Sequence, residues 1–402
     1  MNKPNILMIT PYLPYHSQAG GQTRSYYLLK HLASKNNITL ICFTRDKTGL
    51  SELKKICKKV ILIKRGKTWD LKKVLFTAFS PYPFLVTNYL SPELKIAIQT
   101  ELAKGIYQLI HTECFYLMPN IPFTSIPIIL VDQTIEYAVY QHFVESIKGF
   151  KSLIKPFLWL DVFKLKYWET YYWKKTHTVA AVSEDDKKLM SKMAHRTDIK
   201  LVPNGVAERY FKPKKNISKT NHPSILFGIS NMKWMQNSEG ARLLLHDFWP
   251  TIISAIPQAK LYIIGRYAPQ AFSKYSSPNI IVSEADIDGG DKDPQYYYQT
   301  SWLLLAPIKS GGGSRTKFFE AMASQLPIVT TKQGMEGINI KNNVHAVICP
   351  YSDLATSAIQ LLKDKKQRDY IGHNASALVK KDYSWGKSST KLNNIYKQLI
   401  SL

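Results

Sequence analysis

The segment that decides the fold is residues 305–331, which read LAPIKSGGGSRTKFFEAMASQLPIVTT. An apolar run leads through three glycines, Gly311, Gly312 and Gly313, into a stretch with helical spacing, and a second apolar run follows at 327–331. A strand, a glycine turn and a helix in this order leave backbone N–H groups unpaired at the helix N-terminus, where a phosphate can bind. The segment therefore predicts an α/β unit that holds a phosphate-bearing ligand.

Polar side chains follow the three glycines directly: Ser314, Arg315, Lys317 and Glu320. Arg315 and Lys317 add positive charge for a diphosphate. Glu320 is three residues beyond Lys317 on the same helix face, and it can accept hydrogen bonds from two ribose hydroxyls. A flexible loop with a solvated basic turn is the alternative for a lone glycine triplet. The ordered combination favours a binding site.

The alternation of short apolar runs and longer helical patterns continues to both ends of the chain. Strands are expected at 5–10, 38–44, 60–64, 109–111, 128–132, 178–182, 200–202, 225–230, 260–265, 279–283, 302–307, 327–331 and 346–349. This rhythm is typical of parallel sheets with helices on both faces.

At 402 residues the chain is long enough for two domains. The polar stretch 213–223, placed between two prolines, predicts the linker. The expected domains are then 1–212 and 224–385, with a C-terminal helix at 386–402 packing back on the first.

Composition narrows the class of partner. Lysine and arginine number 54 against 29 acids, a formal charge of +25 that favours nucleotides, nucleic acid or anionic lipids. The four cysteines lie far apart, without the spacing of a metal site or a disulfide scaffold. The apolar run at 6–9 is too short for a signal peptide, and no stretch reaches the roughly 20 apolar residues of a membrane span. A cytoplasmic protein is expected.

The motif in residues 311–329 resembles the nucleotide-binding segment of the family 4 glycosyltransferases of the GT-B fold. That segment reads Gly-Gly-Gly-(Ser/Thr)-Arg-x-Lys-x-x-Glu-Ala-Met-Ala-x-x-x-Pro-(Ile/Val)-Val. The resemblance extends along the chain, through Gly20-Gly21 after the first strand and the runs 182–185, 202–206, 334–337 and 383–385. It implies an α/β fold of two Rossmann-like, doubly wound parallel-sheet domains that face each other across a cleft.

The chain also departs from the family pattern. A glutamate of many members falls at Gly312, so backbone amides would take its place. Of the arginine and lysine pair that many members carry after the first strand of the second domain, this chain offers only Lys233. Neutralising the diphosphate would then rest on Arg315, Lys317 and Arg266.

Two features of the first half are further candidates. Glu136 ends the run Gln133-Thr-Ile-Glu136, which is similar to a family run His-Asn-(Ile/Val)-Glu, so it would contact the acceptor hydroxyl or the sugar; a surface carboxylate at a helix start is an equal alternative. Gly20 and Gly21 open the helix at 22–33 and offer a second set of backbone amides. For His111, at a strand end, a structural role is favoured over ligand contact.

The resemblance implies a retaining glycosyltransferase of the hexosyltransferase type. It would move a sugar from a nucleoside-diphosphate sugar to a glycan or lipid-linked acceptor, in surface polysaccharide or glycolipid assembly. Residues expected at the reacting centre are Glu136, Gly312, Arg315 and Lys317. Residues expected to bind the donor are Gly20, Gly21, Lys233, Arg266, Gly311, Gly312, Gly313, Ser314, Arg315, Lys317 and Glu320.

No cofactor and no metal are expected. Asp286 and Asp288 have the spacing of a metal-binding pair, but the adjacent Gly289-Gly290 favours a turn. Two other functions stay open: a sugar-nucleotide epimerase of the same fold, and a basic nucleic-acid-binding protein. The second lacks its expected motifs, so no nucleic acid is predicted as a partner.

Residues 148–175 interleave aromatic side chains with seven lysines. Helical spacing marks one stripe as core: Leu153, Phe157, Leu160, Phe163 or Lys164, Tyr167 and Tyr171. The remaining Trp159, Trp168 and Tyr172, with the lysines, would then lie on an anionic membrane, which predicts peripheral attachment to its inner face. Packing of these aromatic residues between the domains is the alternative.

Overall fold

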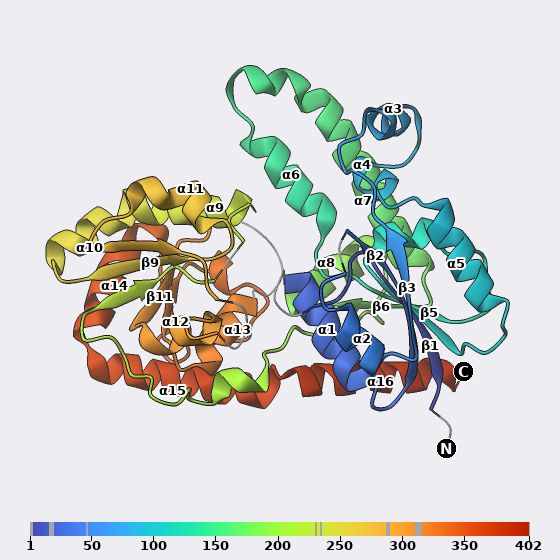
Figure 1. Ribbon diagram of the computed structural model, residues 1–402. Helices are drawn as coiled ribbons and strands as arrows, with labels where there is room; N and C mark the ends of the chain where they lie inside the picture. The colour runs from blue at the N-terminus through green and yellow to red at the C-terminus, as the bar shows by residue number, and fades with distance from the viewer. Residues whose placement is uncertain are drawn as a thin grey trace. The chain divides into compact units, whose positions relative to one another are not determined.

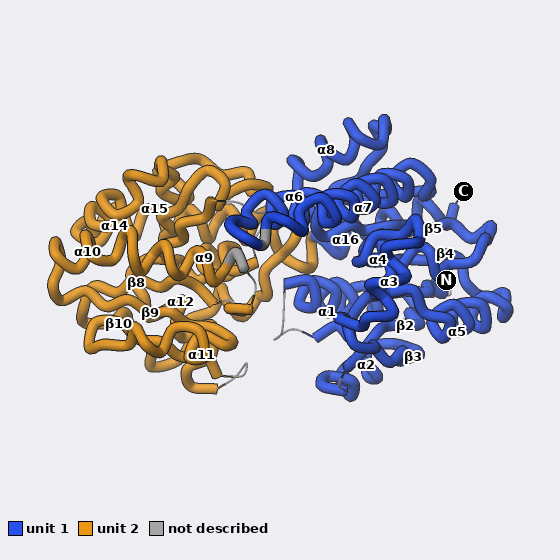
Figure 2. The backbone as a smooth tube through the Cα atoms, turned by 90° about the horizontal axis from the view of Figure 1, so that it is seen from above, with its two compact units in different colours: residues 1–203, 388–402 blue, residues 204–387 orange. Residues whose placement is uncertain are grey.

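The computed structural model describes residues 3–15, 20–45, 47–229, 231–233, 235–286, 290–309 and 316–401. The chain divides into two compact units, each built around its own sheet (Figure 2). Unit 1 contains Met1–Pro203 and Ser388–Leu402, and unit 2 contains Asn204–Lys387.

Unit 1 is built on a parallel sheet whose strand order, among the described residues, is β3-β2-β1-β4-β5-β6-β7. Its strands are β1 (Asn5–Thr10), β2 (Asn37–Thr44), β3 (Lys59–Lys64), β4 (Leu109–Glu113), β5 (Ile128–Val131), β6 (Thr178–Ala181) and β7 (Lys200–Leu201). The central strands β1 and β4 are almost wholly buried, as expected for strands covered on both faces.

Helices pack around this sheet (Figure 1). They are α1 (Gly20–Leu32), α2 (Leu50–Ile56), α3 (Leu71–Phe79), α4 (Phe84–Thr87), α5 (Pro92–Leu102), η1 (Phe115–Asn120), α6 (Glu136–Ser146), η2 (Gly149–Ile154), α7 (Lys155–Lys175), α8 (Glu184–Ala194) and α16 (Trp385–Ile400). Helices α6 and α7 form an antiparallel pair that extends away from the sheet.

The sheet of unit 2 has the order β10-β9-β8-β11-β12-β13 in the described part of the chain. Its strands are β8 (Ser224–Leu226), β9 (Lys260–Ile264), β10 (Ile280–Ser283), β11 (Leu303–Ala306), β12 (Ile328–Thr330) and β13 (Val347–Ile348). Its helices are η3 (Glu208–Phe211), α9 (Met235–Leu243), η4 (Leu244–Phe248), α10 (Trp249–Ala255), α11 (Ala268–Phe272), η5 (Ser273–Tyr275), α12 (Pro294–Thr300), α13 (Thr316–Ala323), η6 (Gln333–Met335), η7 (Tyr351–Asp353), α14 (Leu354–Lys363) and α15 (Lys365–Asp382).

Both sheets contain a point where the strand order reverses. In unit 1 the chain adds β2 on one side of β1 and β4 on the other, and in unit 2 it adds β9 and β11 on either side of β8. In open parallel sheets, ligands bind at the carboxyl ends of the strands beside such a point. This places the search for a site at the loops that follow β1 and β4, and at those that follow β8, β9 and β11.

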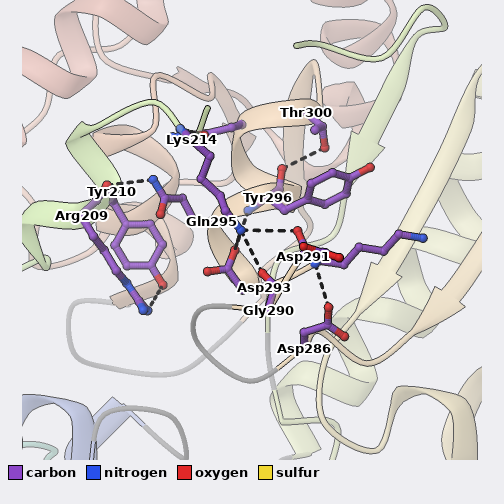
Figure 3. Close-up of polar contacts among 12 residues, drawn as sticks. Arg209, Tyr210, Lys214, Asp286, Gly290, Asp291, Asp293, Gln295, Tyr296 and Thr300 are labelled. Atoms are coloured by element: carbon purple, nitrogen blue, oxygen red, sulfur yellow. Dashed lines mark hydrogen bonds and ion pairs between the residues drawn. The ribbon is translucent and has the colours of Figure 1, made fainter. Parts of the chain in front are cut away.

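The unit boundary differs from the expected linker. The predicted linker at 213–223 lies inside unit 2, where Lys214 Nζ contacts Gly290 O at 2.9 Å and Asp293 Oδ1 at 3.1 Å (Figure 3). Despite its polar composition, this stretch is not an exposed linker, because Lys214 forms a hydrogen bond and an ion pair with the loop that contains Gly290 and Asp293 in the same unit. The units meet in sequence between Pro203 and Asn204 instead.

The C-terminal segment returns to unit 1, which includes residues 388–402. Asn36 Nδ2 donates to Asn393 Oδ1 at 2.9 Å, and Tyr396 Oη lies 2.5 Å from His111 Nδ1 on β4. Asn36, His111, Asn393 and Tyr396 are all buried. The last helix therefore completes the core of unit 1.

The predicted faces of α7 are largely reversed, and of the three aromatic residues expected to face outward only Trp159, at 40% accessible, does so. The expected core stripe is largely exposed: Phe157 is 77% and Phe163 71% accessible. The buried face instead carries Val162, Leu165, Glu169 and Trp173. Trp168 and Tyr172, expected at a membrane, pack against the core of unit 1. Aromatic and aliphatic residues occupy nearly every face of this helix, so their spacing could not identify the inner one.

Candidate functional site

The carboxyl edge of the unit 2 sheet gathers several of the predicted residues. Loops after β8 and β9 carry Lys233 and Arg266, and α13, which follows β11, carries Lys317 and Glu320. Gly228, just after β8, has φ 108°, a conformation that favours glycine, and it lets the chain turn sharply beside Lys317.

Lys317 is buried in the first turn of α13, only 7% exposed. Its Nζ is 5.2 Å from the centre of the Phe227 ring and 3.4 Å from Asn237 Oδ1. An ammonium group in such a place needs counter-charge or hydrogen-bond acceptors. The side-chain oxygen of Asn237 supplies one such acceptor.

A chain of polar contacts joins Lys317 to the loop after β8. Asn237 accepts from Lys317 and donates from Nδ2 to Asn231 O at 3.0 Å, and Asn231 Oδ1 accepts from the backbone of Lys233 at 3.0 Å. Met232 N donates to Arg266 O at 2.9 Å, which ties this loop to the loop after β9. The structure therefore brings Lys233, Arg266 and Lys317 to one region.

Tyr267 is the common neighbour of the other two cations. Lys233 Nζ lies 3.8 Å and Arg266 Cζ 5.1 Å from its ring centre. Its backbone is left-handed at φ 64°, and its N–H donates to Glu284 Oε1 at 2.6 Å. The sequence analysis missed Tyr267 and the asparagines Asn231 and Asn237. Their only signal was position: Asn231 and Tyr267 lie in the loops after the first two strands of the unit, and Asn237 lies at the start of the helix that follows the first loop.

Glu320 has a fixed partner on α12. Tyr298 Oη donates to Glu320 Oε2 at 3.0 Å, and the Tyr298 ring, fully buried, packs edge-on against Tyr210 at 5.9 Å. Burial and the nearby Glu320 carboxylate raise the pKa of Tyr298 well above its ordinary value, so it stays a donor. The tyrosines at 296–298 were not expected to take part in the site from the sequence. Tyr298 nevertheless orients Glu320, a residue predicted to bind the sugar donor.

The glycine turn itself lies outside the described residues. Gly311, Gly312, Gly313, Ser314 and Arg315 are among its members. Their roles at the donor stay predictions.

Of Asp286 and Asp288, the pair with the spacing of a metal-binding motif, the structure describes Asp286. Asp286 Oδ2 accepts from Lys292 N at 2.7 Å, and Asp286 N donates to Lys292 O at 2.9 Å. Asp288 lies outside the described residues. Within the described ranges, no group of three or more His, Cys, Asp or Glu side chains could hold a metal ion.

The carboxyl edge of unit 1 forms a second polar region. Gly21 is the second residue of α1, and a Cβ there would meet Gln133 Oε1 at 2.5 Å and Tyr12 Oη at 2.7 Å, so only glycine fits without a shift. Gln133 donates to Tyr12 Oη at 2.7 Å and to Glu113 Oε2. The predicted Gly20 and Gly21 therefore lie beside the loop that ends at Glu136.

Glu136 begins α6 and is half-buried. Burial and the neighbouring Asp132 raise its pKa to about 8. Its backbone N–H and that of Tyr137 donate to the two oxygens of the buried Glu169 at 2.8 and 3.0 Å. A carboxyl group with a pKa near neutrality at the carboxyl edge of a sheet can exchange a proton with a ligand.

His111 belongs to a buried network. Its Nε2 is 3.4 Å from Glu113 Oε1, and its Nδ1 is next to Tyr396. Arg24, also fully buried, donates to Val202 O at 2.8 Å. None of these groups is accessible, so the structural role expected for His111 fits its position.

Replacing Glu136 with glutamine is expected to flatten the pH dependence of stability. Between pH 4.5 and about 8 the folded protein holds a proton that the unfolded chain has lost, so this group stabilises the fold below the window and ceases to do so as pH rises through it. The slope is at most about 1.4 kcal/mol per pH unit. Thermal unfolding measured from about pH 5 to pH 9 should show a steeper loss in the parent than in Glu136→Gln. Equal slopes would contradict the shifted pKa.

The sequence of the C-terminal half matches a known family of proteins. A family model described as "Glycosyl transferases group 1" matches residues 223–364, inside unit 2. An uncharacterized 44.6 kDa protein in the cps region of Klebsiella pneumoniae is 25% identical over 185 residues. That match spans 44% of this chain and 45% of the relative, so less than half the length of either is aligned.

Solved structures match the whole chain. Anabaena Alr3699/HepE, solved in complex with UDP and glucose, covers 98% of this chain and 100% of its own, with a TM-score of 0.66 and 13% identity. WaaG, a glycosyltransferase involved in lipopolysaccharide biosynthesis, covers 97% and 99%, with a TM-score of 0.67 and 12% identity. At this identity the likeness shows the fold alone. The predicted GT-B fold, with two Rossmann-like parallel-sheet units, is confirmed.

Proposed function

We propose that this chain is a glycosyltransferase that moves a sugar from a nucleoside-diphosphate sugar to an acceptor hydroxyl with retention of configuration. Three findings support the proposal: the group 1 glycosyl transferase model over residues 223–364, the GT-B fold, and the residues at the carboxyl edge of the unit 2 sheet. The fold by itself would not suffice, because one fold hosts many functions.

The observation that carries the proposal is the convergence of Lys233, Arg266 and Lys317 through Asn231, Asn237 and Tyr267. These cations lie at the strand ends next to the switch point, where a diphosphate would also meet the N-terminus of α13. Negative charge builds on the leaving diphosphate during transfer, and fixed cations and amides stabilise it. Glu320, held by Tyr298, is the proposed acceptor of hydrogen bonds from the ribose.

The remaining assignments rest on the resemblance. Glu136 is the proposed contact to the acceptor hydroxyl or the transferred sugar. The acceptor is proposed to be a glycan or a lipid-linked glycan, in surface polysaccharide or glycolipid assembly. The involvement of WaaG in lipopolysaccharide biosynthesis, and the cps region to which the Klebsiella relative belongs, support this class.

A donor screen followed by a transfer assay tests the function. A nucleotide sugar at about 100 times its dissociation constant should stabilise the protein by about 2.7 kcal/mol, which thermal shift detects. The best donor is then incubated with extracts of surface glycans as acceptors and, as a control, alone. Turnover without any acceptor would identify an epimerase instead. The absence of any stabilising nucleotide sugar would contradict the donor site.

The same assay tests metal dependence. We expect turnover to survive EDTA, because cations and backbone amides are proposed to carry the phosphate charge. Loss of turnover with EDTA, restored by magnesium or manganese, would contradict this.

A further inference from the structure

Unit 1 carries a large set of exposed apolar side chains on two neighbouring segments. We call them the apolar face: Trp69, Leu71, Leu75, Phe76 and Phe79 in and before α3, and Phe150, Leu153, Ile154, Phe157, Leu160 and Phe163 in η2 and α7. The most exposed are Phe79 at 91%, Phe150 at 88% and Trp69 at 81%. Soluble surfaces carry single exposed apolar residues, whereas a set of this size marks a site of interaction.

The two segments are joined by specific contacts. Lys164 of α7 donates from Nζ to Thr77 O and Ser80 O at the end of α3, both at 2.8 Å. Trp168 Nε1 donates to Pro81 O at 2.9 Å, and Asp161 Oδ1 accepts from Phe84 N at 2.8 Å. Helix α3 therefore lies beside α7, as Figure 1 also shows. Lys164, a predicted membrane lysine, instead holds α3 in place.

Helix α3 gains little from the core of unit 1. All of its residues are described and none is buried. An isolated helix of nine residues is marginal in water, and helices usually persist because an apolar face packs on something. The apolar side of α3 points to solvent, so a partner that covers it would stabilise it.

The surroundings of the apolar face are basic. Residues 64–79 contain five lysines and arginines against Asp70, and residues 148–175 contain seven lysines against Asp161 and Glu169. All three acids are engaged by backbone N–H groups: Asp70 by Lys72, Asp161 by Phe84, and Glu169 by Glu136 and Tyr137. Lys67, Lys72, Lys148 and Lys166 are exposed. A partner of negative charge fits this rim.

We propose that the apolar face seats unit 1 on the surface of an anionic lipid bilayer. Aromatic and aliphatic side chains would enter the headgroup boundary while the lysines contact lipid phosphates. A second copy of the chain is the less suitable occupant. A two-fold interface would set the same lysines against one another, and lysine is depleted from protein interfaces.

The residues of the apolar face are not those expected at a membrane from the sequence. Of the expected anchors, Trp168 and Tyr172 pack inward while Trp159 is exposed, and the stripe expected in the core faces out together with α3. No helix among the described residues is long and apolar enough to cross a bilayer. The proposal does not depend on the proposed function, because lipid binding needs no donor.

Vesicle flotation of the full chain tests the proposal. The probes are vesicles of phosphatidylcholine alone and of phosphatidylcholine mixed with phosphatidylglycerol. We expect the parent to float with the anionic vesicles and added salt to release it. The triple variant Phe79→Ser, Phe150→Ser, Phe157→Ser should bind the anionic vesicles at least about a hundredfold more weakly. The double variant Lys72→Glu, Lys148→Glu should lose about thirtyfold or more.

Matched control variants distinguish a specific role of the apolar face from a general effect of fewer exposed apolar residues or of lower net charge. Ile96→Ser with Phe123→Ser removes exposed apolar groups from other parts of unit 1, and Lys363→Glu with Lys366→Glu makes the same charge change in unit 2. Both should float as the parent does, and circular dichroism checks that every variant folds. Failure of the parent to float, or equal losses in the controls, would overturn the proposal. So would self-association in sedimentation that the triple phenylalanine variant abolishes, because it would assign the face to a second copy.

Discussion

Lys317→Met is expected to weaken binding of a nucleoside diphosphate by about ten- to a hundredfold. Methionine keeps most of the buried volume beside Phe227 and removes the charge, which isolates the electrostatic contribution. A charged hydrogen bond is worth about 1.5–3 kcal/mol, and this sets the expected range. Isothermal titration with UDP, GDP and ADP measures it. Lys363→Met, at an exposed lysine that ends α14, is the matched control and should bind as the parent does.

Glu320→Gln and Tyr298→Phe extend this test to the ribose. Both should weaken binding of the nucleoside diphosphate while leaving pyrophosphate binding unchanged, because Glu320 is proposed to contact only the sugar hydroxyls. A purely structural role for Tyr298 would lower affinity for both ligands alike. If Lys317→Met and Glu320→Gln both bind nucleoside diphosphates as the parent does, the donor site lies elsewhere.

Glu113→Ala is expected to lower the free energy of unfolding of unit 1 by about 3–5 kcal/mol. Although burial favours the neutral acid, hydrogen bonding and charge from His111, with the charge of Arg24, hold the pKa of Glu113 below its ordinary value. It is therefore an anion at neutral pH. Removing it would leave the buried Arg24 without its nearby negative charge, and it would take away one acceptor of the Gln133 amide, which also donates to Tyr12 and Ser25. Scanning calorimetry measures this loss of stability, provided that the unfolding transitions of the two units are analysed separately.

Two variants make this measurement specific. Glu113→Gln keeps the volume and removes only the charge, so it should cost less than alanine but still destabilise. Glu93→Ala removes an exposed glutamate from α5 and should change stability by no more than about 0.5 kcal/mol. A loss below about 1 kcal/mol in Glu113→Ala would show that the network contributes little.

The sequence by itself determined the architecture and the location of the donor candidates. Buried parallel strands read as continuous apolar runs, so the alternation with helices was visible along the whole chain. Spacing within one helix is also local: Lys317 and Glu320 had to share a face of α13. These features depend on neighbours a few residues away, which is why composition and periodicity were enough.

Only the tertiary structure decided which faces and partners these elements have. Helix α7 carries apolar residues on most sides. Which side is buried is therefore determined by its contacts with α3 and with the core of unit 1. The polar stretch at 213–223 lies inside unit 2, because its side chains bond to residues about 80 positions away. Lys317 contacts Asn237 across 80 positions, and Tyr298 orients Glu320 from the preceding helix, 22 positions away. Contacts between residues this far apart in sequence leave no local pattern, and they determine which charged groups are buried, paired or presented to a ligand.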